Sequence, residues 1–395
     1  MQFTSSPPVP YRILPIIVFS QFAGTSLWFA GNAVLSNLQI ELGITSQILG
    51  HITSAVQLGF ILGTLLFAVL SLADRFSPRN LFLICSLLGA IANLAIIFIC
   101  LNVTTLLLFR FITGLFLAGI YPVGMKIAAD WHEKGLGKAL GYLVGALVLG
   151  TAFPHLLKAL TPAFPWTYIL YGTSGFAVLG GLLLWSLVPN GPYRKKNKAP
   201  NFKAAFGIFK IKAFRQAAVG YFGHMWELYT FWAFVPVMLA SYPNWPEMEG
   251  FAVPAVSYYA FWIIAPGSLA CIAGGYLSQR FGSKSIATWA LALSLACGLV
   301  SPWMFGLSFP IFVIFLLFWG LVVIADSPQF STLVAQTVPK ELTGTGLTVV
   351  NCLGFSLTVI SLQVLTGLKV HINEPYLYLF LALGPFIGLV ALLRK

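Results

Sequence analysis

The chain consists of long apolar stretches separated by short polar loops. Each apolar stretch is continuous and about 20 residues long, which is the length of a helix that spans a bilayer. Strands of an outer-membrane barrel would alternate apolar and polar residues instead. The pattern predicts twelve membrane-spanning helices, with approximate cores at residues 13–38, 47–72, 81–100, 105–128, 138–160, 165–188, 214–240, 255–277, 285–305, 309–334, 343–367 and 375–393.

The longest loop divides these spans into two sets of six. Residues 189–213 form a polar, basic segment, which we interpret as a linker between bundles at residues 1–188 and 214–395. Short motifs recur in the two halves at offsets of 205 to 207 residues, as in the pairs Arg75 and Arg280, Pro122 and Pro328, and Gly137 and Gly344. A near-constant offset indicates duplication, which is typical of secondary transporters that bind substrate between their halves.

Composition supports an all-α membrane protein. Of the 395 residues, 58% are hydrophobic and 8% are charged, whereas soluble proteins carry about 25% charged residues. The net charge of +12 is gathered in alternate loops and at both chain ends. By the positive-inside rule, these loops and both termini are expected in the cytoplasm, so the charge does not indicate a nucleic-acid partner.

Enzymatic chemistry has little support in the sequence. The five cysteines fall in or beside apolar runs without metal or redox spacing, and we interpret them as packing residues. We find no metal-spaced cluster and no P-loop, so we expect neither an enzyme nor a cofactor. A receptor would normally carry a signalling domain or a long tail, and both tails here are short.

Two loops carry related motifs, "LSLADRFSPR" after the second span and "GYLSQRFGSK" after the eighth. Together with "RFITGLFLAG" in the fourth span, they resemble the loop and arginine motifs of the major facilitator superfamily. The resemblance covers the whole chain and implies two pseudo-symmetric six-helix bundles. It also implies that the two loops latch an inner gate, through Asp74, Arg75, Gly275, Arg280, Gly282 and Lys284. The alternative is that these charges only anchor the orientation of the chain.

Departures from the superfamily's subgroup patterns limit the choice of substrate. Nitrate and nitrite porters carry an arginine within spans two and eight, and this sequence has none there. Sugar-porter signatures are absent. The fifth span also lacks the Gly-Pro pair of the exporter signature, which favours uptake over drug efflux.

Charges deep inside spans are costly and usually mark transport pathways or proton relays. The deep charges are Arg110, Glu227 and Asp326, with His224 beside them, and they lie on spans four, seven and ten. The resemblance implies that these spans line the central cavity. We hypothesise that Glu227 carries a coupling proton and His224 tunes it. Arg110 could pair with Glu227 in one conformation or bind an anionic substrate in the other. A fixed structural pair across the two halves is the alternative.

Polar and aromatic residues within the spans are candidates for the cavity wall, because binding sites are mostly apolar with a few placed polar groups. The candidates are Gln21, Trp28, Asn32, Gln57, Tyr121, Trp226, Tyr229 and Gln329. Trp and Tyr also mark membrane interfaces, so a purely structural role is open for each aromatic residue.

The sequence therefore predicts a monomeric secondary transporter of the bacterial inner membrane. It would move a small solute, such as an organic anion, amino acid or other zwitterion, by alternating access with proton-coupled uptake. An exporter of a drug-like or siderophore-type compound is the alternative. A non-transporting receptor is the weaker third candidate.

Overall fold

A computed structural model describes residues 9–44, 47–100, 102–132, 136–194, 207–243 and 252–394. These residues are helical almost throughout. The first half contains α1 (Ile13–Thr25), α2 (Ala30–Ala33), α3 (Leu35–Leu42), α4 (Ile48–Val69), α5 (Leu72–Arg75), α6 (Pro78–Ile99), α7 (Val103–Leu117), α8 (Tyr121–Trp131), α9 (Leu136–Leu160) and α10 (Thr167–Leu187). The second half contains α12 (Lys212–Ala240), α13 (Ala252–Ile264), α14 (Gly267–Phe281), α15 (Ser283–Met304), α16 (Phe309–Ala325), α17 (Ser327–Gln336), η2 (Lys340–Leu342), α18 (Thr343–Leu368), α19 (Glu374–Leu377), η3 (Tyr378–Ala382) and α20 (Leu383–Leu393).

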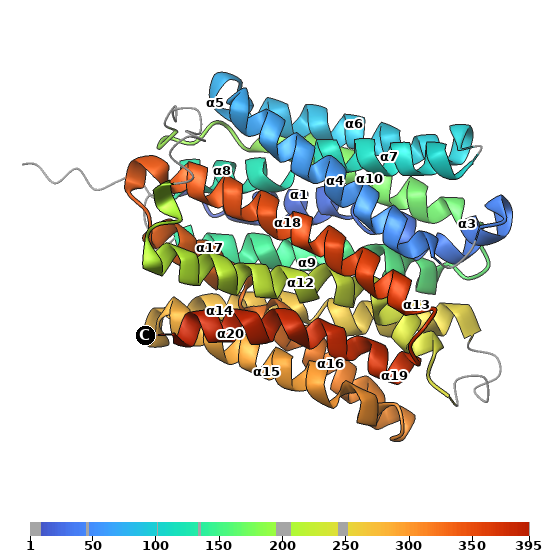
Figure 1. The fold of residues 1–395 in the computed structure, drawn as a ribbon. Coiled ribbons are helices and arrows are strands. Elements are labelled where there is room, and N and C mark those ends of the chain that lie inside the picture. The colour runs from blue at the N-terminus through green and yellow to red at the C-terminus, as the bar shows by residue number, and fades with distance from the viewer. Residues whose placement is uncertain are drawn as a thin grey trace, which may run out of the picture.

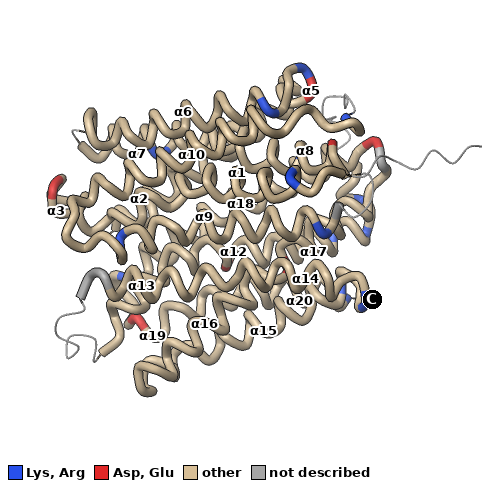
Figure 2. Tube along the Cα trace, turned by 180° about the vertical axis from the view of Figure 1, so that it is seen from behind, with Lys and Arg blue, Asp and Glu red and all other residues tan. Residues whose placement is uncertain are grey.

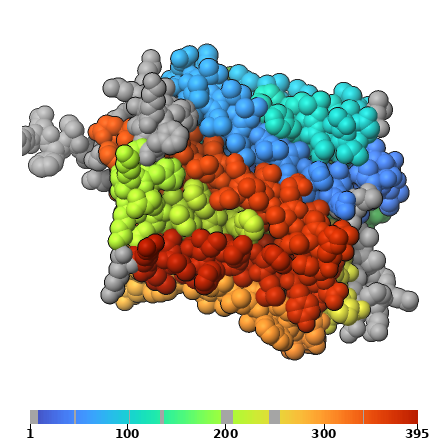
Figure 3. Space-filling model, in the orientation of Figure 1, coloured from blue at the N-terminus to red at the C-terminus, as the bar shows by residue number. Residues whose placement is uncertain are grey.

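The long helices run side by side, with the first half on one side and the second half on the other (Figure 1). Two sets of contacts join the halves: α4 packs against α18, and α9 packs against α13 and α14. On the face in Figure 3, α18 lies along α4 across the boundary between the halves. Residues 195–206 of the predicted linker lie outside the described residues.

Ten helical segments in the described chain are long and apolar enough to cross a membrane. Large apolar side chains on their outer faces are exposed. On α6, for example, Ile84, Leu88 and Ile91 share one face and are 51%, 38% and 61% exposed. Such a surface suits lipid rather than water. The chain is therefore an all-helical, multi-pass membrane protein.

The two ends of the bundle differ in their content of charged residues. Lys and Arg gather at the end where α5, α17 and the C-terminus lie, and we call this the basic end (Figure 2). The opposite end carries α3, α13 and α19.

The first predicted span is not one continuous helix. It is divided into α1, α2 and α3, with breaks after Thr25 and around Val34. At the first break, two side-chain hydroxyls bind backbone carbonyls. Thr25 Oγ1 donates to the Gln21 carbonyl, and Ser26 Oγ donates to the Ala23 carbonyl. Such bonds compete with the regular backbone ladder and favour a helix end. The remaining carbonyls at the break are bound by Arg110, described below.

Two glycines allow α4 and α7 to approach closely. A Cβ atom on Gly114 would overlap the Val56 carbonyl, and one on Gly59 would overlap the Phe111 carbonyl. Because these neighbours are backbone atoms, rotation of a side chain cannot relieve the overlap. Gly114, which belongs to the arginine motif of the fourth span, is thus required for helix packing.

We predict that Gly114→Ala lowers the free energy of unfolding by about 1–3 kcal/mol, because one added methyl group overpacks the contact between α4 and α7. The melting temperature of the purified protein in detergent measures this effect. Gly175→Ala on α10 is the matched control, because its Cβ would meet no atom within 4 Å. Equal melting temperatures for the two variants would contradict the packing role.

Candidate functional site

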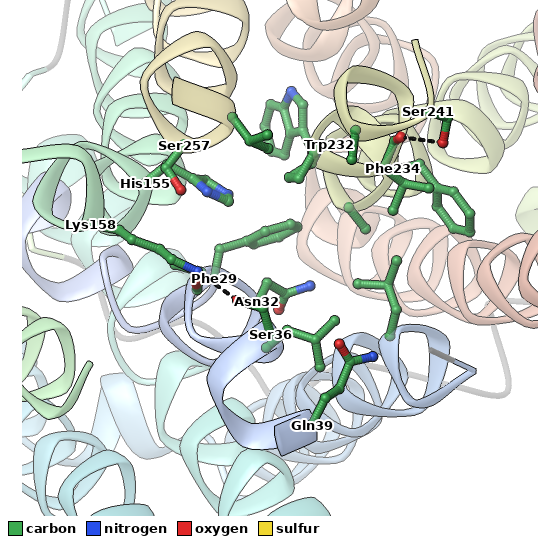
Figure 4. Close-up of a pocket in the computed structure, with 18 of the residues that line it drawn as sticks. Phe29, Asn32, Ser36, Gln39, His155, Lys158, Trp232, Phe234, Ser241 and Ser257 are labelled. Atoms are coloured by element: carbon green, nitrogen blue, oxygen red, sulfur yellow. Dashed lines mark hydrogen bonds between the residues drawn. The ribbon is translucent and has the colours of Figure 1, made fainter. Parts of the chain in front are cut away.

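A cavity of about 320 Å³ lies between the two halves near the opposite end of the bundle (Figure 4). Its volume falls at the lower end of the range for small-molecule sites, roughly 300–1,000 Å³. The first half contributes residues around α2, α3 and α9, and the second half contributes α12, α13 and α18. Residues that line it include Phe29, Asn32, His155, Lys158, Trp232 and Ser257.

The charges of the cavity are cationic, and no Asp or Glu is found among its described lining residues. Lys158 Nζ donates to the Ala33 carbonyl at 2.7 Å and to Ser36 Oγ at 2.9 Å, which are both neutral acceptors. Lys369 Nζ lies 3.4 Å from Glu374 Oε1, so its charge is balanced. The cavity therefore presents one lysine whose described hydrogen-bond partners carry no charge.

Two further polar side chains of the cavity have unused hydrogen-bonding atoms. His155 is 2% exposed, and its Nε2 has no hydrogen-bond partner in the described chain. Asn32 Nδ2 donates to Thr53 Oγ1 at 2.7 Å, but Asn32 Oδ1 is without a partner there. Buried polar atoms without partners are rare in folded proteins, and they are expected where a ligand binds.

An aromatic stack lies on the basic-end side of the cavity. The Trp28 ring stacks on Tyr229 and on Phe355, with centroid distances of 5.4 Å and 5.7 Å. Because α12 runs from the basic end to the opposite end, Tyr229 lies about one helical turn closer to the basic end than the cavity-lining Trp232. The stack thus joins α12 and α18 to the first span beneath the cavity.

The halves also meet closer to the basic end, where α9 packs on α14. Lys138 Nζ lies 5.1 Å from the centre of the Tyr276 ring, and the Tyr142 and Tyr276 hydroxyl oxygens are 3.4 Å apart. The cavity and these contacts lie at opposite ends of the interface. In this conformation the halves leave a cavity between them at the opposite end, and the contacts between α9 and α14 hold them together at the basic end.

Arg110 is completely buried and caps the broken first span. Its Nη1 donates to the Leu27 carbonyl at 3.1 Å and reaches Asn93 Oδ1 at 3.5 Å, and its Nη2 donates to the Trp28 carbonyl. These carbonyls follow the end of α1, where no helical amide can satisfy them. Arg110 thus replaces the missing backbone donors.

Glu227 is also buried, but its partners are neutral. Its carboxylate accepts hydrogen bonds from Ser294 Oγ at 2.8 Å and from Trp319 Nε1 at 2.7 Å. These residues lie on α15 and α16, so the carboxylate is held inside the second half. In this conformation Arg110 and Glu227 do not contact one another among the described residues, so a fixed structural pair across the halves is absent, and pairing in another conformation stays a prediction. The reason is that backbone carbonyls and neutral donors already occupy the two groups.

His224 and Asp326 form the closest pair of titratable groups in the described core. His224 Nδ1 lies 2.7 Å from Asp326 Oδ1, and each residue is 1% exposed. Asp326 sits at the junction of α16 and α17, where Pro328 follows and the helix is interrupted. The pair joins α12 to this junction, one turn from Glu227.

Of the eight predicted wall residues, Asn32 alone is among the described lining residues of this cavity. Gln21 and Gln57 are buried with side-chain amides that make no hydrogen bond in the described chain. Tyr121 begins α8, and Gln329 is buried on α17 near Gly274 of α14. Trp226 was predicted to line the cavity but does not: its Nε1 donates to the Phe380 carbonyl at 2.9 Å. Trp226 lies on the face of α12 that packs against η3 and α20, because Gly384 leaves room for it there.

The loop motifs lie at the basic end. Asp74 forms an ion pair with Lys126 of α8 at 2.9 Å, and Arg194 Nη2 donates to the Asp74 and Phe76 carbonyls. These contacts stay within the first half and its adjoining linker. Arg75 is exposed beside them.

The second loop motif joins α14 to α15 through a single residue. This residue is Gly282, whose φ of +82° strongly favours glycine. Gly275, Arg280 and Lys284 flank this turn. Neither Arg280 nor Lys284 forms an ion pair among the described residues.

His155 and Lys158 were not predicted as site residues, although they lie near the end of the fifth span. The signal in the sequence is their spacing of three, which places both on one face of α9. Whether that face meets lipid or a cavity depends on tertiary packing, which the sequence pattern does not show.

Comparison with known proteins places most of the chain within a family of transporters. Residues 16–362 match the sequence profile of the family described as Major Facilitator Superfamily. A probable nitrate/nitrite antiporter of Thermus thermophilus, NarK1, is 25% identical over 307 residues, which cover 74% of this chain and 67% of the relative. The niacin transporter NiaP of Acinetobacter baylyi is 39% identical over 112 residues, which cover 25% of each protein.

The fold is similar to solved transporter structures. The proton:xylose symporter XylE, bound to 6-bromo-6-deoxy-D-glucose, superposes with a TM-score of 0.74. The match covers 97% of this chain and 94% of that structure at 12% sequence identity. At this identity, the likeness concerns the fold alone.

We predict that Arg110→Met lowers the free energy of unfolding by at least about 2 kcal/mol, because it leaves buried carbonyls of the first span without donors. Thermal unfolding followed by circular dichroism in detergent measures the loss. Arg280→Met, at an exposed position of the basic end, is the control and should change stability little. An Arg110→Met variant as stable as this control would show that the capping of the first span is dispensable.

Proposed function

Since this chain belongs to the Major Facilitator Superfamily of secondary transporters, we propose that it moves a small organic anion or zwitterion through the cavity between its halves. The observation that carries the proposal is the cavity lining, which contains cationic groups and no described acidic group. An anionic solute would be attracted to such a site, and its body would contact the apolar walls.

Uptake is the proposed direction. The basic end corresponds to the cytoplasmic side by the positive-inside rule, so the cavity at the opposite end would face the exterior of a bacterial inner membrane. A packed basic end and an exterior cavity describe the outward-facing state, which carriers adopt in import and export alike, so the proposed direction rests on the missing Gly-Pro pair of the fifth span. Alternating access would then open the α9–α14 contact and close the cavity.

Nitrate is a second candidate, because one relative is named as a nitrate/nitrite antiporter. The described α4 carries no arginine, and the single arginine of α14, Arg280, is exposed at the basic end. A cavity of about 320 Å³ with walls such as Phe29 and Trp232 is large and apolar for an inorganic ion. These features favour an organic solute.

We expect proteoliposomes that contain the purified protein to accumulate an organic anion or amino acid when the pH outside is lower than inside. Candidate solutes are first selected by thermal stabilisation against a panel of carboxylates, amino acids, sugars and siderophores. Uptake of labelled solute is then followed with and without the proton gradient. Empty liposomes are the control, and selective stabilisation and uptake of neutral sugars would contradict the proposed solute class.

For proton coupling, the His224–Asp326 pair is the favoured site. A proton on this pair gives an imidazolium and a carboxylate 2.7 Å apart with no net charge, and its release leaves the Asp326 carboxylate beside a neutral His224 imidazole. Either carboxylate would carry one net charge after losing its proton, with neutral Ser294 and Trp319 as the partners of Glu227. Only Asp326 lies at an interrupted helix, the junction of α16 and α17, where a change of charge can act on the helix itself.

We predict that Asp326→Asn abolishes accumulation driven by a proton gradient but retains exchange of labelled for unlabelled solute. Exchange requires the carrier to change conformation while loaded, whereas accumulation also requires release of the proton. Glu227→Gln is the matched control and should keep both activities, since an amide oxygen can still accept from Trp319. Loss of accumulation in Glu227→Gln, with normal accumulation in Asp326→Asn, would assign the proton to Glu227 instead.

A further inference from the structure

One ammonium group connects the cavity to the broken first span. Lys158 on α9 donates to Ala33, the last residue of α2, and to Ser36 in the first turn of α3. An ammonium group has three N–H donors, and these two contacts use two of them. The third donor is available at the wall of the cavity, beside Asn32 and Phe29 (Figure 4).

We propose that Lys158 and His155 form a carboxylate-binding subsite, and that the solute is a monocarboxylate with an apolar, ring-containing body. This inference rests on the proposed function and narrows its solute class. Lys158 would supply the charge, and His155 Nε2 would supply a second donor. Figure 4 shows both side chains directed toward the same cavity from α9.

The polar contacts of Lys158 favour a carboxylate over a neutral acceptor. Hydrogen bonds between ionised partners are about twice as strong as neutral ones. The present partners of Lys158 are a carbonyl and a hydroxyl, so its charge is unbalanced among the described residues. A carboxylate would balance that charge, and one such group would be sufficient because Lys369 already has Glu374.

The rest of the cavity suits an apolar ring. Phe29 and Trp232 meet edge to face, with centroids 6.4 Å apart and planes at 83°. Phe234, Val237 and Val256 add further apolar wall. Aromatic side chains of this kind bind ring systems through stacked or edge contacts.

Binding at this subsite would also stiffen the first span. The carboxylate, Lys158 and the carbonyl of Ala33 would form one continuous hydrogen-bonded connection across the break after α2. Because the first span is bent at this point, solute would stabilise the bend that shapes its own cavity.

The test uses the purified full chain in detergent, with benzoate, phenylacetate and 3-phenylpropionate as probes and the corresponding amides as neutral analogues. Isothermal titration calorimetry measures each Kd. We expect the best acid to bind at least about tenfold tighter than its amide, which corresponds to one charged hydrogen bond. Lys158→Gln should remove this preference, and Lys158→Arg should keep most of it.

Lys369→Gln provides the comparison, because it removes a positive charge that Glu374 already balances, and it should retain the preference for acid. Equal loss in both glutamine variants would show a diffuse charge effect and overturn the subsite. Equal binding of acid and amide by the native chain would overturn it as well, as would no binding of any acid. If proteoliposomes then still transport another anion or zwitterion, the proposed function stands and only the ring-containing monocarboxylate is excluded.

Discussion

The structure depends on the capping of one broken helix by two cationic side chains, the buried Arg110 and the partly buried Lys158. The first span is interrupted twice, and each interruption leaves carbonyls that no helical amide can reach. Arg110 binds the carbonyls of Leu27 and Trp28 after α1, and Lys158 binds that of Ala33 after α2. In a membrane interior without water, such carbonyls must be satisfied by the protein. The breaks in turn direct Trp28, Phe29 and Asn32 toward the second half of the chain.

Because the carbonyls of the broken span need donors, charged residues that look alike in the sequence have different roles in the structure. Arg110 and Lys158 both hold the first span, but only Lys158 borders the cavity. In the second half, Glu227 is held by neutral donors, whereas Asp326 faces His224. A charge deep in a span therefore marks either architecture or chemistry, and its partners distinguish the two.

The helical membrane fold could be predicted from the sequence, since unbroken apolar runs of span length leave few alternatives. The break in the first span could not, because the carbonyls that it leaves are satisfied by Arg110 on α7, far along the chain. Trp226 was misplaced for a related reason: large apolar and aromatic residues occur on every face of span seven, so periodicity cannot separate its cavity face from its packing face. The pair His155 and Lys158 was visible in the sequence, but only the packing of α9 shows that it meets a cavity.

The stack of Trp28 on Tyr229 and Phe355 has a consequence for the speed of the carrier. Opening toward the basic end must separate these rings, and each aromatic pair is worth about 0.5–1.5 kcal/mol beyond its buried area. Trp232 connects the stack to the cavity, since its ring lies 5.2 Å from that of Tyr229. A solute that presses on Trp232 could therefore loosen the stack, whereas an empty cavity leaves it intact. The rings would act as a brake on the empty carrier, which would open toward the basic end more slowly when no solute is present.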